Sequence, residues 1–491
     1  MDSGKGRKLL FVGGDLSGIQ DFLYNITTSK AAVSLKGRSK YLEEYLQGVL
    51  RELLGSPGVV AYDGEGIKGG VVYDSGGKFY AVVEDSAEAR QAIGELARRE
   101  ERRLWEQHYG QLSVCIVQVP FEFTSTGGIR VEGGEEERLG TLWRAANMGF
   151  ARHKAQKFRT VIDDAYDELF QPQGGGGQTR VCAVTGIESE RCVALGRCED
   201  GSTIYVLPSV KEQIERGQAL QRQEGGKSFE EYAGGSRLGV LRMDVDGLGT
   251  VFSEGFATFG DYARFSAQLV GFFKQRLTEI VRGAEFRNYV CVVYAGGDDL
   301  FAVGRWDKVI GFAHEVREAF VRHINRKGVT MSGGMVVVDV NFPIAKAAEL
   351  SGEAENEAKK FGGGQKNAFC MLGQSLSWEG EFGVVKRWAD KMVEQCRKGD
   401  LPRSILHRLM TLNAMRQNGN PAALWETAYY LTRFAKDKQS AAPFCNDMKC
   451  FLNEPAKSKR NYALAALAAR WAELLLRETE QKETNIKTAE I

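Results

Sequence analysis

The sequence predicts an α/β protein in which one pattern of strands and helices occurs twice and is followed by an all-α segment. Residues 9–119 and 238–340 each run through the order β-α-β-β-α-β. We call the regions that contain these stretches, residues 1–165 and 237–376, the two repeats. A Gly-rich and polar stretch separates them, and helical patterning dominates from residue 377 onward. These changes predict domains at residues 1–165, 166–236, 237–376 and 377–491.

The composition is that of an ordinary globular protein. With 43% hydrophobic residues and only 9 Pro among 491 residues, the chain is neither disordered nor collagen-like. Its 65 Lys and Arg almost balance its 64 Asp and Glu, so any binding to nucleic acid has to be local or shared with partners. No apolar run reaches the roughly 18 residues that span a bilayer. The nine scattered Cys fit a reducing compartment, so we expect a cytoplasmic protein without membrane contact.

The first repeat begins with an apolar strand and a helix. Gly13–Asp15 is expected to form a phosphate-sized turn between them, because paired Gly residues permit tight turns. A further pair, Gly76–Gly77, separates two β-rich runs and indicates a hairpin. The expected elements are a strand at residues 9–12, a helix to about residue 54, a hairpin at 71–83, a helix at 87–107, and a strand at 114–119 that ends before Pro120.

The second repeat follows the same order and adds a last helix and strand. The expected elements are a strand at residues 238–246, a helix at 262–282, a hairpin at 289–304, a helix at 307–326, a strand at 330–340, a helix at 344–361 and a strand at 367–372. In the helical segment after it, large aromatic residues are expected to anchor the core. They are Trp378, Trp388, Trp425 and Trp471.

The hairpin of the second repeat carries the sharpest chemical signal. Its turn reads Gly296-Gly297-Asp298-Asp299, so two flexible Gly residues are followed by two adjacent carboxylates. Turns often contain Asp and Gly for structural reasons alone, which leaves an inert turn as an alternative. A second acidic group, Asp244 and Asp246, ends the first strand of the same repeat, which should be the neighbour of this hairpin. Clustered carboxylates with room for phosphate are typical of Mg²⁺ sites, so we favour metal-assisted nucleotidyl transfer.

Three further features could contact phosphate. Lys359 ends a helix and Lys366 begins the next strand, where a triphosphate could lie, although a helix-terminal Lys also simply complements the helix dipole. The turn Gly247-Leu248-Gly249 precedes a helix and could offer backbone N–H groups.

The Cys residues between the repeats do not form a zinc-ribbon pattern. Cys182, Cys192 and Cys198 lack the close pairs that such a site requires, which argues against zinc.

Seven short motifs occur in a specific order along the chain. They are residues 14–22, 35–39 and 75–79 in the first repeat, and 244–249, 296–299, 332–334 and 366–367 in the second. Over about residues 9–480 this combination resembles the large catalytic subunit of type III CRISPR effector complexes. The two palm domains of that family share a ferredoxin-like fold with GGDEF diguanylate cyclases and class III nucleotidyl cyclases, so the resemblance implies two palms here.

The resemblance implies a nucleotidyltransferase that makes a cyclic oligoadenylate second messenger from ATP. The catalytic residues would be Asp244, Asp298 and Asp299, and these with Val245 would hold two Mg²⁺ or Mn²⁺ ions while a 3′-hydroxyl attacks an α-phosphate. The implied nucleotide contacts are Asp15, Ser17, Gly18, Gln20, Gly76 and Gly77 in the first palm, and Gly247, Leu248, Gly249, Gly296, Gly297, Lys359 and Lys366 in the second.

The same resemblance implies the partners. Guide RNA and target RNA would be bound through a multisubunit complex that includes a small helical subunit and a subunit that caps the guide end. Capture of target RNA would switch synthesis on.

The sequence departs from the family pattern in two ways, at its start and between the palms. The first palm begins almost at residue 1 and no His is followed by Asp, so we expect a member without the HD nuclease and no DNA cleavage. Thr185 and Leu195 stand where zinc-ribbon Cys residues would be, so zinc is not expected. The first hairpin reads Ser75-Gly76-Gly77-Lys78 and lacks the acidic pair, so this palm is expected to bind nucleotide without catalytic ions.

Two other functions remain open from the sequence. The palms could join AMP to a different acceptor, which would give another second messenger. Alternatively, the chain could be an inactive structural scaffold of the same complex. A cluster of carboxylates shows that a protein could support catalysis, but it does not show that the protein catalyses a reaction.

Overall fold

The computed structural model of the chain describes residues 7–24, 31–131, 134–170, 179–197, 200–224 and 226–489. The chain divides into two compact units. The first contains the residues up to Met331 together with Val338–Leu350, and the second contains Ser332–Val337 together with the residues from Ser351 onward. Among the described helices, none is both long enough and apolar enough to cross a membrane.

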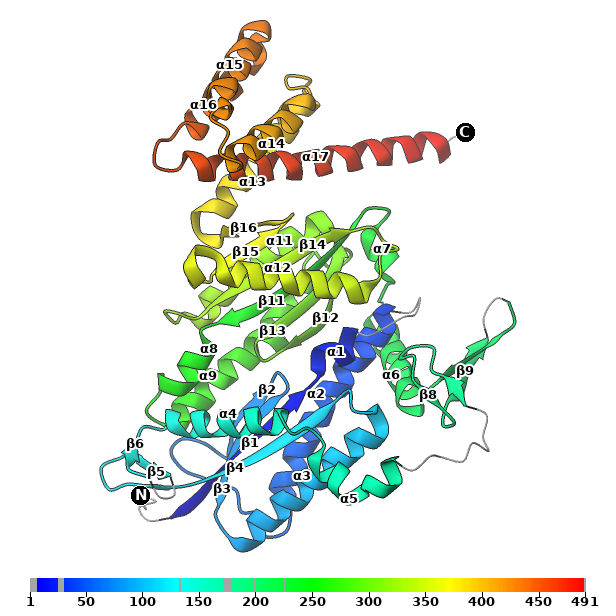
Figure 1. Cartoon of the computed structure of the whole chain (residues 1–491), viewed down its shortest axis with the longest axis vertical. Helices are drawn as coiled ribbons and strands as arrows, with labels where there is room; N and C mark the ends of the chain where they lie inside the picture. The colour runs from blue at the N-terminus through cyan, green and yellow to red at the C-terminus, as the bar shows by residue number, and fades with distance from the viewer. Residues whose placement is uncertain are drawn as a thin grey trace. The chain divides into compact units, whose positions relative to one another are not determined.

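The first repeat forms a six-stranded sheet in the order β2-β3-β1-β4-β5-β6 (Figure 1). Its strands are β1 (Lys8–Ser17), β2 (Val71–Ser75), β3 (Lys78–Glu84), β4 (Ser113–Phe123), β5 (Ile129–Val131) and β6 (Glu136–Glu137). β1 pairs antiparallel with both β3 and β4, and its apolar start at Leu9–Val12 is fully buried. The hairpin and the central strand expected from the sequence are therefore confirmed.

Two expectations for this sheet are wrong. Gly13 and Gly14 lie within β1 instead of forming a turn, and β4 continues through Pro120. A Cβ atom at Gly14 would lie 2.1 Å from the Phe79 ring, so the glycine permits close packing inside the sheet. Pro120 is tolerated in β4 because the pairing with β5 begins only after it, at Phe121.

Helices cover both faces of the first sheet. They are α1 (Ile19–Tyr24), α2 (Ala31–Gly55), α3 (Ala87–His108), α4 (Gly140–Lys154), α5 (Arg159–Phe170) and, from the second repeat, α9 (Phe259–Gly271). α2 and α3 pack on the face that contains Leu10 and Val12. On the other face, Phe11 lies 4.7 Å from Trp143 of α4, measured between ring centroids. Trp143 stacks on Tyr262 of α9 at 3.9 Å, so aromatic packing joins the two repeats.

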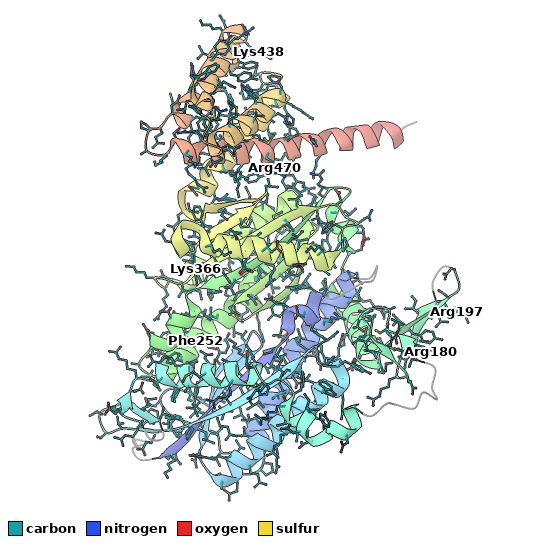
Figure 2. The ribbon with its side chains drawn as sticks, in the orientation of Figure 1. Arg180, Arg197, Phe252, Lys366, Lys438 and Arg470 are labelled. Carbon is teal, nitrogen blue, oxygen red and sulfur yellow. The ribbon has the colours of Figure 1, made fainter. Side chains whose placement is uncertain are left out.

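A small insert follows α5. It contains β7 (Arg180–Val181), β8 (Glu188–Ser189), β9 (Val193–Arg197), β10 (Thr203–Val206), α6 (Pro208–Glu224) and α7 (Phe229–Ala233). Arg180 and Arg197 mark this insert in Figure 2, and the Arg180 guanidinium lies 4.0 Å above the Tyr205 ring. Buried Cys182 and Cys192 form a common apolar core with residues of β10 and α6. Cys198 and the Gly-rich linker expected at residues 174–177 lie outside the described residues.

The second repeat copies the strand arrangement of the first. Its elements in the first compact unit include β11 (Leu238–Asp246), α8 (Leu248–Glu254), η1 (Phe272–Arg276), α10 (Leu277–Arg282), β12 (Val290–Gly296), β13 (Asp299–Arg305) and α11 (Trp306–Ile324). β13 pairs antiparallel with β12 and β11, as β3 does with β2 and β1. The helix expected at residues 262–282 contains a π-helical turn, η1, whose Phe272 packs on Phe320 of α11.

The second compact unit contains the end of the second repeat and the helical segment. Its elements include β14 (Thr330–Val338) and α12 (Ile344–Gly364) in part, then β15 (Ala368–Met371), β16 (Gln374–Ser377), η2 (Trp378–Phe382), α13 (Gly383–Arg397), α14 (Ser404–Gln417), α15 (Ala422–Asp437), η3 (Gln439–Ala441), α16 (Ala442–Leu452) and α17 (Ser458–Ala489). Trp378 and Trp471 are buried as expected, and Trp388 is half-buried. Trp425 is 63% exposed on α15, so its assignment as a core anchor is wrong.

The predicted fold class is confirmed: two α/β repeats are followed by a helical region. The limits of the four domains remain predictions.

Glycines permit a close contact between the helices α2 and α6 of the first compact unit. A Cβ atom at Gly37 would lie 1.8 Å from the Gln213 carbonyl oxygen, and one at Gly217 would lie 2.0 Å from the Val33 carbonyl oxygen. Both obstacles are backbone atoms, which cannot rotate away as a side chain can. The insert is therefore docked on the first repeat through two positions that require glycine.

We predict that Gly37→Ala destabilises the protein by about 1–3 kcal/mol, because the helices must move apart to admit the methyl group. The matched control is Gly48→Ala in the same helix, where a Cβ atom meets nothing within 4 Å. That change should stabilise α2 by roughly 0.5–1 kcal/mol. Urea unfolding of both variants measures the difference. A Gly37→Ala protein as stable as the wild type would contradict the proposed docking.

Candidate functional site

The pairing of β11 with β13 brings two of the predicted carboxylates face to face. Asp244 and Asp299 are register partners in this antiparallel pair. Directly opposite residues project their side chains from the same face of a sheet, with Cβ atoms typically about 4.5–5.5 Å apart. Both side chains are half-buried. Two acidic groups that lie more than fifty positions apart in the sequence thus form one site.

The third carboxylate, Asp298, belongs to the turn between β12 and β13. Gly297 adopts a φ of +65°, which favours glycine at this position. The Asp298 N–H donates to the Gly296 carbonyl oxygen at 2.8 Å, and the Val245 N–H donates to the Asp298 carbonyl oxygen at 2.9 Å. The backbone of this turn is therefore held against the end of β11.

Asp246 differs in character from Asp244. Only 2% of Asp246 is exposed, and its Oδ2 accepts a hydrogen bond from the Thr330 hydroxyl at 2.8 Å. The two carboxylates noted together in the sequence therefore have different environments. Asp244 faces Asp299, whereas Asp246 ties the end of β11 to the start of β14.

The chemistry of Asp244, Asp298 and Asp299 fits a hard divalent cation. Among the residues that the structure describes, no group of three or more His, Cys, Asp and Glu is arranged as a ready metal cage. Mg²⁺ does not require one, because it is usually bound by one or two carboxylates together with water and substrate phosphates. A facing pair with a third carboxylate on the adjoining turn matches that requirement.

Two tyrosines lie close to these carboxylates. Burial raises the pKa of Tyr294 far above its usual value, and the negative charges of Asp299 and Asp298 raise it further. Burial also raises the pKa of Tyr73, with Asp298 as the largest electrostatic contribution. Both phenols therefore remain protonated at physiological pH and can act only as neutral polar groups beside the acidic turn.

The first repeat has a carboxylate at the equivalent place, but there a lysine and not an aspartate faces it. Asp15 is the register partner of Lys78, as Asp244 is of Asp299. The Leu16 N–H donates to the Gly77 carbonyl oxygen at 2.8 Å, which matches the bond between Val245 and Asp298.

Two ammonium groups surround the Asp15 carboxylate. Lys154 Nζ lies 2.7 Å from Asp15 Oδ2, and Lys78 Nζ lies 4.0 Å from Oδ1, while Asp15 itself is only 3% exposed. Two lysine side chains thus balance the charge of this buried carboxylate.

The turns that follow the two central strands are also equivalent. Gly18 has a φ of +88° and Gly247 a φ of +80°. A Cβ atom at either would lie within 2.3 Å of a backbone carbonyl oxygen, so both turns require glycine. Ser17 stands where the second repeat has Asp246. The other predicted contacts, Gln20, Leu248 and Gly249, lie at the start of α1 or α8, with Gln20 and Gly249 exposed.

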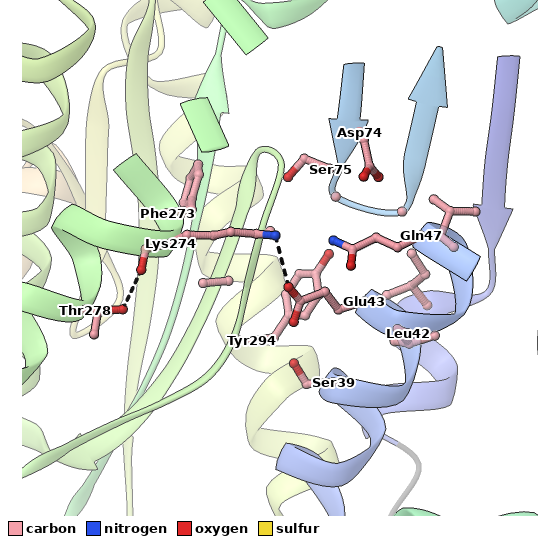
Figure 3. A pocket seen from close by; sticks show the side chains of 16 residues that line it. Ser39, Leu42, Glu43, Gln47, Asp74, Ser75, Phe273, Lys274, Thr278 and Tyr294 are labelled. Atoms are coloured by element: carbon pink, nitrogen blue, oxygen red, sulfur yellow. Dashed lines mark hydrogen bonds and ion pairs between the residues drawn. The ribbon is translucent and has the colours of Figure 1, made fainter. Parts of the chain in front are cut away.

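A cavity of about 240 Å³ lies beside the two hairpins, between the repeats (Figure 3). Its walls come from α2, the β2–β3 turn with Gly76 and Gly77, the end of β12 at Gly296, and the π-helical turn η1. Lys274 of η1 projects into it and forms an ion pair with Glu43 of α2 at 3.2 Å.

The pKa values of the two acidic groups that line this cavity, Glu43 and Asp74, are shifted in opposite directions. Burial tends to raise the pKa of Glu43, but Lys40 and Lys274 outweigh it and lower that pKa overall. Burial raises the pKa of Asp74, with Lys274 opposing the shift. Glu43 is thus the charged partner of Lys274 at neutral pH, in a cavity whose walls also contain apolar side chains such as Leu42 and Phe273.

Two predicted phosphate contacts belong to the second compact unit. Lys359 forms an ion pair with Glu355 at 2.7 Å within α12. Lys366 follows this helix, is exposed, and adopts a φ of +60° (Figure 2). Their role in phosphate binding remains a prediction.

The described Cys residues of the insert are packed as apolar groups. The Leu207 N–H donates to Cys182 Sγ at 3.4 Å, and the Cys192 thiol donates to the Arg180 carbonyl oxygen at 3.3 Å. Burial raises the pKa of the Cys192 thiol, which favours its neutral form.

Several polar residues of the site were not predicted from the sequence. They are Glu43, Lys154 and Lys274, and also Ser75, whose hydroxyl oxygen accepts the Gly297 N–H at 2.9 Å. Ser75 occurs in a motif that the sequence analysis did note, immediately before Gly76. The three charged residues lie on helices and carry no local signal, because their role depends on contacts between distant parts of the chain.

Two family models match this chain. The model described as Cas10/Cmr2, second palm domain, matches residues 237–370. The model described as Csm1 subunit domain B matches residues 8–173. The first match contains the three carboxylates, and the second contains Asp15 and its lysine partners.

Curated relatives agree with these matches. The chain is 28% identical over 430 residues to a protein of Enterococcus italicus named CRISPR system single-strand-specific deoxyribonuclease Cas10/Csm1 (subtype III-A), with 74% of this chain and 54% of the relative covered. A Mycobacterium tuberculosis protein of the same name is 25% identical, with 91% and 65% covered. The chain therefore spans between about half and two thirds of the length of these relatives.

Solved structures show the same fold. A crystal structure of an apo Csm1–Csm4 cassette matches with a TM-score of 0.67 at 20% identity, covering 96% of this chain and 71% of the other. The cassette in complex with cA4 matches with a TM-score of 0.66 at 20% identity, covering 95% and 70%. With both palm regions matched by family models and the fold shared along the chain, this protein belongs to the Cas10/Csm1 family.

Proposed function

We propose that this chain is the cyclic oligoadenylate synthase subunit of a type III-A CRISPR effector complex and is activated by target RNA. The observation that carries the proposal is the placement of Asp244 opposite Asp299 with Asp298 on the adjoining turn. This arrangement suits the transfer of an adenylyl group from ATP to a 3′-hydroxyl, with release of pyrophosphate. Solved Csm1–Csm4 cassettes in complex with AMPPNP and with pppApA support it.

The two palms have different tasks in this proposal. In the second palm, Asp244, Asp298 and Asp299 would hold the divalent ions beside the α-phosphate. Mg²⁺ or Mn²⁺ bound there would polarise the phosphoryl group and favour loss of the proton from the attacking hydroxyl. In the first palm, Lys78 and Lys154 neutralise Asp15. This palm therefore binds the second nucleotide without a metal, and chemistry is confined to one centre.

The partners follow from the relatives. We propose that the chain assembles with a Csm4-type subunit, because solved Csm1–Csm4 cassettes share its fold. Guide RNA, target RNA and a small helical subunit would complete the complex, and the helical region from residue 377 onward is the proposed contact of that small subunit. The division into four domains, namely the two palms, the insert and the helical region, remains part of this proposal.

DNA cleavage is not part of the proposal. The curated relatives are named as deoxyribonucleases, but the sequence contains no His followed by Asp. We propose that these 491 residues do not cleave DNA, which incubation of the protein with single-stranded DNA and Mn²⁺ tests directly.

The proposed function predicts that a product forms from ATP. The complex assembled with guide RNA, partners and target RNA should convert ATP into adenylate rings, and the double change Asp298→Ala/Asp299→Ala should lower the rate by about 100-fold or more. Mass spectrometry of the products measures it. The control Asp163→Asn, at a carboxylate 66% exposed on α5, should leave the rate unchanged.

Other outcomes would decide between the alternatives. Adenylate joined to an added nucleotide or metabolite, with no ring formed from ATP alone, would favour a different acceptor. Failure to form any product in a complex shown to bind target RNA would favour a structural scaffold.

A second prediction tests the neutralised carboxylate of the first palm. Lys154→Met should destabilise the protein by roughly 1–3 kcal/mol, because Asp15 then remains buried with only the more distant Lys78 nearby. Asp15→Asn combined with Lys154→Met should recover much of this loss, which thermal unfolding can measure. Additive losses in the double variant would show that the ion pair contributes nothing.

A further inference from the structure

We infer that Ser75, in the first palm, is a positioning residue for the catalytic turn of the second palm. The inference rests on the proposed function, since it assigns a role in the same reaction. Ser75 is the last residue of β2, next to the turn Gly76–Gly77. Its hydroxyl oxygen accepts a hydrogen bond from the Gly297 N–H at 2.9 Å.

The two hairpin tips touch at this point. A Cβ atom at Gly76 would lie 2.6 Å from the Gly297 Cα atom, and one at Gly297 would lie 2.5 Å from the Gly76 Cα atom. Only two glycines permit backbones to approach so closely. The turn that carries Asp298 and Asp299 therefore rests directly on the hairpin of the other palm.

The hydrogen bond completes the restraint of the catalytic turn. On one side, the Asp298 carbonyl oxygen is bound by the Val245 N–H of β11. On the other side, the Gly297 N–H is bound by Ser75. Because Gly297 is buried, loss of this acceptor would leave its N–H unsatisfied or force the turn to shift. A shift at Gly297 moves the next residue, Asp298, which is one of the proposed metal ligands.

The restraint acts in one direction only. Ser75 is the register partner of Lys78, and Gly296 is the register partner of Asp299, so Gly296 is the counterpart of Ser75 in the second palm. Glycine has no hydroxyl group with which to return the bond. The first palm thus steadies the turn with the acidic pair, while its own turn cannot receive the same side-chain hydrogen bond from Gly296.

Contact between the palms does not depend on Ser75 alone. The ion pair of Glu43 with Lys274 and the stacking of Trp143 on Tyr262 also join the two repeats. Removal of one hydroxyl group should therefore leave the palms associated and alter the turn locally. This separates a positioning role from a purely structural one.

The test compares Ser75→Ala, Ser75→Thr and Ser75→Val in the complex with target RNA. Thr keeps the hydroxyl, and Val has nearly the shape of Thr without it. We expect Ala and Val to lower kcat about tenfold and to raise the Mn²⁺ concentration for half-maximal rate by a similar factor, with KM for ATP nearly unchanged. Thr should restore both values toward those of the wild type.

The structural control is Ser86→Ala. Ser86 caps α3 by accepting the Ala89 N–H at 3.0 Å, far from the turn in the chain. This change should lower the melting temperature and leave the Mn²⁺ requirement unchanged. If Ser86→Ala shifts the Mn²⁺ requirement as Ser75→Ala does, the effect is one of general stability and the inference is wrong.

Mn²⁺ affinity measured by electron paramagnetic resonance, with a non-hydrolysable ATP analogue, provides a readout that needs no turnover. Weaker Mn²⁺ binding in Ser75→Ala and Ser75→Val, but not in Ser75→Thr, supports the inference even if the wild-type complex makes no oligoadenylate and the proposed function fails. Unchanged Mn²⁺ affinity and kcat would overturn it. A rise in KM alone would also overturn it, because Ser75 would then contact the nucleotide.

Discussion

The antiparallel register between β11 and β13 is the constraint on which the site depends. It places Asp244 opposite Asp299 and lets the Val245 N–H hold the turn at Asp298. A shift of one residue in this register would turn every side chain of β11 to the other face of the sheet. The buried apolar residues of β11, Val240 and Leu241 among them, oppose such a shift because they would lose their packing.

The same register in the first repeat explains why one fold supports two different sites. In both repeats the central strand pairs with the hairpin in the same way, and a glycine with a positive φ follows the central strand. What differs is the partner across the strands: a lysine faces Asp15, whereas an aspartate faces Asp244. Lys78 and Lys154 thus neutralise Asp15 in the first repeat, whereas Asp244 lies in a cluster of carboxylates that could bind cations.

The sequence was sufficient to predict the two repeats and both hairpins, because these features are local and periodic. It also predicted that Asp244 lies beside the acidic turn, which the register of β11 with β13 confirms. It misplaced Gly13–Gly14 and Pro120, where cross-strand packing with Phe79 and the late start of the β4–β5 pairing decide the structure. It also missed Lys154 and Lys274. Their partners lie more than 100 residues away in the chain, and no pattern in one sequence reveals such pairs.

The contact between Gly76 and Gly297 affects which amino-acid substitutions each half of this protein can accept. Two separate identical subunits that meet tip to tip must carry every substitution twice, so both of their sites change together. Here the two tips belong to one covalent chain and are independent positions. One half can therefore lose its acidic residues and gain a serine that serves its neighbour, which a symmetric pair of subunits cannot do.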